Sequence, residues 1–268
     1  VKQTKPAEFD RLFPLDITAP TDNRPYFFFH ARARDILRGK KEAASFGGSS
    51  FNTPAVKILL RLAAITSALG SMLVVFPLFW LRISARPLRL PVYFAGIGLA
   101  FMFVEIGLMQ RLSLFLGHPV YGFTVGLFGL LMFSGIGSWT FERLSLAPRG
   151  WRLVAALVAA ILGIDLVSHY ALAYAAAWDT PSRLGLALLL LAPAGLFMGL
   201  AFPLGMSQAR AANDPRGPWF WTINGAFSVI GSVLAMLACL TLGIRETIWL
   251  GAAVYALVTL ASRDGFAR

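Results

Sequence analysis

The chain has 268 residues, of which 57% are hydrophobic and only 14% are charged, and its mean hydropathy is +0.68. Soluble domains carry roughly a quarter charged residues, so this composition excludes an ordinary soluble protein and indicates a membrane protein. The net charge of +11 does not indicate nucleic-acid binding, because basic loops flanking membrane spans explain it better than a basic face on a soluble domain.

Residues 1–54 differ in character from the rest of the chain. They hold nine of the 24 Lys and Arg residues and six of the 13 Asp and Glu residues, and they end in the linker-like stretch "SFGGSSFNTP". We expect residues 1–54 to be the tail of an upstream soluble domain plus a linker, and residues 55–268 to form a transmembrane helical domain. The chain begins with Val and has no recognisable signal peptide, so we expect it to be part of a longer protein.

Seven apolar runs follow, each long enough or nearly long enough to span a bilayer as a helix of about 20 residues. Their continuous apolarity excludes the alternating strands of a β-barrel. The last run is the shortest, with 16 uncharged residues between Glu246 and Arg263. The sequence therefore predicts an all-α polytopic bundle of about seven spans, at 58–81, 91–111, 119–140, 151–177, 184–206, 219–242 and 246–262.

The orientation of this bundle stays open. Short loops on one side, together with the C-terminus, hold ten Arg, whereas the opposite loops hold three. Because positive short loops face the cytoplasm, this asymmetry predicts that residues 1–54 lie outside the cell. The nine basic residues of 1–54 favour the reverse.

Several stretches resemble one family of bacterial membrane proteins. They are "TDNRPYFF" (21–28), "YFAGIGLAFMFVEIGLMQRLSLFLGHPVYGFTVGLFGLLMFSGIGS" (93–138), "FPLGM" (202–206) and "WTINGAFSVIGSVLA" (221–235). They are similar to multi-span proteins of the spermidine synthase-like group, in which a methyltransferase/aminopropyltransferase-type domain is joined to membrane helices. The resemblance covers about residues 12–258, and the middle block is its most specific part.

The resemblance implies that this chain is the C-terminal membrane half of such a protein, in the bacterial inner membrane. A cofactor of the S-adenosylmethionine type would bind the upstream transferase-type domain, and we expect none in this segment. Gly96-x-Gly98 and Gly135-x-Gly137 lie in apolar helices, so they are not adenosyl-binding loops. No catalytic residue can be carried over, and the fold of the upstream domain would not by itself establish polyamine chemistry.

Glu105 interrupts an otherwise apolar run. About ten residues of its span precede it, so it lies within the hydrocarbon region, where an acid costs several kcal/mol unless it is neutral, paired or facing water. It could be a proton or cation site, or a protonated or Arg-paired residue that fixes helix register. Gln110 and Arg111 follow, and Arg111 is expected to reach the membrane interface. His118 lies in a Gly-His-Pro turn and could relay protons, although a simple polar turn explains it as well.

Asp165 lies near the middle of the fourth span, with His169 four residues later on the same helix face. We expect a structural pair, a proton relay or a ligand site; a metal site would need further ligands, of which only Glu105 is evident. Asn224 must find a hydrogen-bond partner in a neighbouring helix. Small residues at helical spacing predict close helix packing, in particular Gly122, Gly126, Gly129, Gly195 and Gly199.

Nucleophilic triads, zinc-ligand spacings and phosphate loops are not recognisable in this sequence, so we expect the segment itself to be non-catalytic. The expected partners are the lipid bilayer and the upstream domain, and the oligomeric state stays open. Three functions remain. The first is a membrane anchor for a transferase-type domain, with a polar intramembrane site. The second is a transporter-like bundle for a small cation, a polyamine or a proton, and the third is a structural scaffold.

Overall fold

A computed structural model describes residues 19–26, 53–80, 88–144, 146 and 150–266. The described part consists of long helices joined by short turns, and within it the only strand-like feature is a bridge between Thr21 and Arg24. The elements are α3 (Thr53–Trp80), α4 (Arg89–Leu116), α5 (Pro119–Arg143), α6 (Gly150–Tyr174), the 3₁₀ turn η3 (Ala175–Ala177), α7 (Thr180–Ala211), α8 (Gly217–Thr241) and α9 (Ile244–Phe266).

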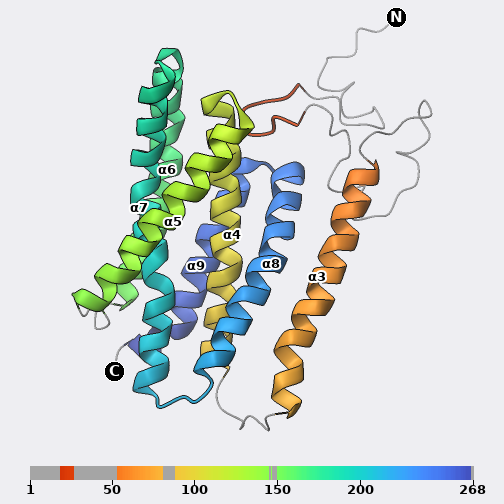
Figure 1. Ribbon diagram of the computed structural model, residues 1–268, viewed down its shortest axis with the longest axis vertical. Helices are drawn as coiled ribbons and strands as arrows, with labels where there is room; N and C mark the ends of the chain where they lie inside the picture. The colour runs from red at the N-terminus through yellow and green to blue at the C-terminus, as the bar shows by residue number, and fades with distance from the viewer. Residues whose placement is uncertain (1–18, 27–52, 81–87, 145, 147–149, 267–268) are drawn as a thin grey trace, which may run out of the picture.

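The predicted all-α bundle is confirmed. Each of the seven apolar runs coincides with one of the helices α3 to α9, and six helices, α3 to α8, are long and apolar enough to cross a bilayer. The chain runs up and down through the bundle, so consecutive helices are antiparallel (Figure 1). α9 is a helix of 23 residues, but the charged Arg245 and Glu246 occupy its first turn, and it falls outside the six.

α4 is the central helix. Its span is 61% buried inside the protein, whereas the span of α3 is only 6% buried. α4 packs against α5, α7, α8 and α9, while α3 lies along the edge of the bundle against α8 (Figure 1). The indole Nε1 of Trp219 on α8 donates a hydrogen bond to the carbonyl of Val74 on α3, at 3.0 Å. The described side chains of α3, at 57–74, are therefore mostly exposed, as on a lipid-facing helix.

Glycines allow α5 to approach both of its neighbours closely. A methyl group at Gly122 would meet the backbone of Ser113 on α4, and one at Gly126 would lie 2.7 Å from Met109. Gly129 and Gly195 lie at the contact between α5 and α7, where a methyl group on Gly195 would lie 2.7 Å from Phe133. A methyl group at Gly199 of α7 would meet the carbonyl oxygen of Ser134. In a bilayer the hydrophobic effect does not drive helices together, because lipid tails are as apolar as the side chains. Close backbone contacts of this kind then stabilise the association of the helices.

Two turns and the segment 19–26 lie at the same end of the bundle, beside the polar site described below. The α4–α5 turn at Gly117, with φ of 74°, and the α8–α9 turn at Gly243, with φ of 129°, both lie there. Positive φ favours glycine at both positions. Residues 19–26 lie at this same end (red in Figure 1).

A candidate polar site at one end of the bundle

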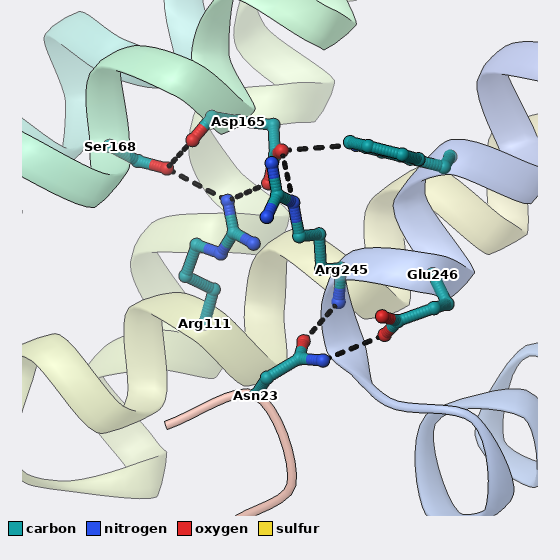
Figure 2. A network of polar contacts seen from close by, with 7 residues as sticks. Asn23, Arg111, Asp165, Ser168, Arg245 and Glu246 are labelled. Atoms are coloured by element: carbon teal, nitrogen blue, oxygen red, sulfur yellow. Dashed lines mark hydrogen bonds and ion pairs between the residues drawn. The ribbon is translucent and has the colours of Figure 1, made fainter. Parts of the chain in front are cut away.

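Asp165 of α6 is the centre of a buried ion-pair network (Figure 2). Its side chain is 4% exposed, and its Oδ1 lies 2.6 Å from Nη1 of Arg111 on α4. Its Oδ2 accepts hydrogen bonds from Nε of Arg245 and from the indole Nε1 of Trp249, both at 3.0 Å. Three helices, α4, α6 and α9, therefore meet at one carboxylate.

Arg111, which the sequence predicts to reach the membrane interface, contacts α6 with its guanidinium group. Its side chain is 18% exposed, and its Nη1 contacts both Asp165 and Oγ of Ser168, the latter at 2.8 Å. Ser168 in turn donates to the backbone carbonyl of Asp165 at 3.1 Å. Arg111 is therefore a structural partner of α6, five residues before α4 ends at Leu116.

The sequence also offers His169 as a partner of Asp165. The side chain of His169 lies outside the described residues, so this pair stays a prediction. The carboxylate that it was meant to neutralise already faces two guanidinium groups. Asp165 is consequently not a free acid that could attract a cation.

The turn at Thr21–Arg24 is fastened to this end of the bundle through Asn23. Backbone N–H groups of Ile244 and Arg245, which have no partner within α9, donate to the carbonyl oxygen and to Oδ1 of Asn23 at 2.9 and 2.7 Å. Nδ2 of Asn23 donates to Glu246 at 2.7 Å (Figure 2). A residue that precedes α3 in the chain thus caps α9, the helix whose Arg245 and Trp249 contact Asp165.

Tyr26 continues the same contact. Burial, together with the neighbouring Cys239 of α8, raises the pKa of the Tyr26 hydroxyl well above its usual range. Cys239 also lies beside Thr247 of α9. The segment 19–26 therefore rests on α8 and α9 together rather than on the turn alone.

Glu105 lies in the middle part of α4 and is not a member of the Asp165 network. It is 4% exposed, and among the described residues no hydrogen bond or ion pair to its carboxyl group occurs. Tyr255 of α9 is close enough for a Coulombic interaction with it. Because an ionised carboxylate without a cation is costly in such surroundings, the neutral acid is the form that this site favours.

The remaining predicted polar residues, Gln110, Asn224 and His118, make separate contacts, two between helices and one at a helix end. Nε2 of Gln110 lies 3.7 Å from the sulfur of Met236 on α8. Nδ2 of Asn224 donates to the carbonyl of Phe94 at 3.1 Å, which joins α8 to α4. Nδ1 of His118 accepts the N–H of Val120 at 3.3 Å, so His118 caps α5 and is exposed. The predicted cluster is thus not one site.

The described residues contain no group of three His, Cys, Asp or Glu side chains that could hold a metal ion. The network that does form includes residues that sequence reasoning missed. In the sequence, Glu246 only marks the start of the last apolar run, with Arg245 before it, and Asn23 stands only within "TDNRPYFF". Each of these two stretches is a polar cluster beside an apolar run. The sequence around it does not indicate which distant residue it contacts.

Comparison of the chain with protein-family models, with curated proteins and with solved structures finds no match. The class of the protein therefore rests on the fold and the site alone. It is an all-α, membrane-embedded helix bundle with an ion-pair network at one end, where residues 19–26 contact the start of α9.

Proposed function

We propose that this chain is the membrane half of a spermidine synthase-like integral membrane protein of the bacterial inner membrane. In this proposal it anchors an upstream transferase-type domain that binds a cofactor of the S-adenosylmethionine type. The observation that carries the anchor role is the double cap of α9 by Asn23. Asn23 belongs to the stretch that would end the upstream domain, so the cap would tie that domain to the bundle.

The geometry favours an anchor over a freely tethered domain. A flexible linker alone would let an upstream domain move away from the membrane. Here eight described residues, 19–26, precede the linker and contact α8 and α9 through Asn23 and Tyr26. The end of the upstream domain would therefore be held at a defined place on the bundle.

The test uses the full-length protein purified from its native membrane in nanodiscs. We expect it to bind S-adenosylmethionine or its decarboxylated form in calorimetric titrations, and to transfer a labelled methyl or aminopropyl group to an acceptor. Glu105→Gln is the matched control, because an anchor predicts unchanged transfer in that variant. Absence of binding of either cofactor, with an upstream reading frame that encodes no adenosyl-binding domain, would refute the proposal.

A second candidate function rests on Glu105. A buried acid without a described ion-pair partner in a membrane helix is a functional-site hypothesis by default. The bundle would then carry a proton or a small cation, such as a polyamine, through a site at Glu105 alone, because Asp165 is neutralised by two arginines. In proteoliposomes, radiolabelled spermidine uptake should then disappear in Glu105→Gln while the variant stays folded. Uptake equal to that of the unmodified protein would exclude Glu105 as the transport site, and no uptake by the unmodified protein would exclude the transport role.

A further inference from the structure

The Asp165 network contains more positive charge than its central carboxylate can neutralise. Two guanidinium groups, those of Arg111 and Arg245, face one carboxylate. Glu246, the residue after Arg245, is turned toward Asn23 and accepts a hydrogen bond from its amide (Figure 2). About one positive charge is left without a partner among the described residues of the network.

Arg111 and Arg245 also have guanidinium N–H groups that take no part in the described contacts. Arg111 contacts its described partners only through Nη1, and Arg245 contacts Asp165 only through Nε. Their remaining guanidinium N–H groups have no acceptor among the described residues. A guanidinium presents five donors in a planar fork, which suits the oxygens of a phosphate.

Arg245 is reachable from outside the protein. Its side chain is 52% exposed, and its Cζ lies 4.7 Å from the centre of the Trp249 ring, which holds the guanidinium in place without using its N–H groups. Exposed aromatic side chains also lie near the end of α6, directly after η3 and on α9. Such a belt is typical of the depth at which lipid headgroups lie. Its members are Tyr170, Tyr174, Trp178 and Trp249.

We propose that Arg111 and Arg245 form a binding site for a phosphate group between α4, α6 and α9, with Asp165 as the internal counter-ion that orients both guanidinium groups. The phosphate can come from the headgroup of an anionic lipid or from a free phosphate-bearing solute. Basic positions between membrane helices bind lipid headgroups by this chemistry. The site is independent of any activity of an upstream domain.

The experiment compares two membranes and two anions. The protein is reconstituted into nanodiscs of phosphatidylcholine alone, or of an equal mixture of phosphatidylcholine and phosphatidylglycerol, and inorganic phosphate is titrated into the first. Stabilisation by phosphatidylglycerol alone indicates a lipid headgroup, and stabilisation by inorganic phosphate indicates a free solute. If neither anion raises the unfolding temperature, the proposal is wrong.

Arg245→Gln tests the residue itself, because Arg111 still neutralises Asp165 in that variant. Native mass spectrometry should show about five-fold weaker retention of the bound anion, the loss that one interfacial arginine typically causes. Arg143→Gln is the control, since Arg143 also stacks on a tryptophan, at 5.4 Å, but at the opposite end of the bundle and away from Asp165. Equal affinity in Arg245→Gln, or an equal loss in Arg143→Gln, would overturn the proposal.

If Arg245→Gln does not fold, Arg245→Lys replaces it. Lysine keeps the charge but loses the fork, so a smaller but measurable loss of affinity is expected. Unchanged anion affinity in Arg245→Lys would then contradict a two-donor contact from this side chain.

Discussion

Asn23 and Arg245 are 222 residues apart, and Oδ1 of Asn23 accepts the backbone N–H of Arg245 at 2.7 Å. The same Arg245 uses its side chain to hold Asp165. Arg245 thus joins the segment 19–26 to the buried network between α4, α6 and α9. The cap of α9 and the position of Arg245 are consequently linked.

Asn23→Ala should destabilise the bundle by about 1 kcal/mol, because it removes a side-chain acceptor from the first turn of α9. The measurement is the unfolding temperature in detergent micelles. Asp22→Ala is the control, since Asp22 lies in the same turn but does not contact α9 in any described hydrogen bond. A loss equal to that of Asn23→Ala in the control would assign the effect to the turn rather than to the cap.

Asp165→Asn should be more costly, because it leaves two guanidinium groups beside a neutral amide. Removing one partner of a buried ion pair costs about 3–5 kcal/mol, and the exposure of Arg245 places the expected loss at the lower end of that range. SDS titration in mixed micelles measures the free energy of unfolding. Asp179→Asn is the matched control, because Asp179 caps α7 from an exposed position and Asn caps equally well.

The double variant Asp165→Asn with Arg245→Gln gives a sharper result. Removing one of the two uncompensated charges should restore part of the lost stability, so the two changes should be less than additive. Strict additivity would mean that Asp165 and Arg245 do not interact in the folded protein.

The helices were predictable because a bilayer imposes a local rule. A run of about 20 apolar residues is visible in the sequence, and each of the seven runs became a helix. The same rule identified Asp165 and Glu105 as exceptions. It could not supply their surroundings, because Ser168 meets Arg111 across 57 residues and Asp165 meets Arg245 across 80. The sequence therefore indicates the near neighbour His169 as a partner of Asp165 and gives no sign of the distant arginines.

The membrane assignment predicts how the protein fractionates. Large apolar side chains on α3, such as Ile58, Leu69 and Met72, are more than half exposed, which lipid tolerates and water does not. The protein should stay in the pellet when membranes are washed with alkaline carbonate, and it should aggregate when detergent is removed. A monodisperse protein in detergent-free buffer would contradict a lipid-facing α3.

Gly199→Ala tests whether close backbone contact holds α5 against α7. An added methyl group would meet the carbonyl oxygen of Ser134, and backbone cannot move aside as a side chain can. The expected loss is about 2–3 kcal/mol in the free energy of unfolding. Gly185→Ala on the same helix is the control, because no atom lies within 4 Å of its added methyl group. That change should instead stabilise α7 by up to about 1 kcal/mol, since alanine is the better helix former. Similar effects of both substitutions would mean that the two helices do not depend on this contact.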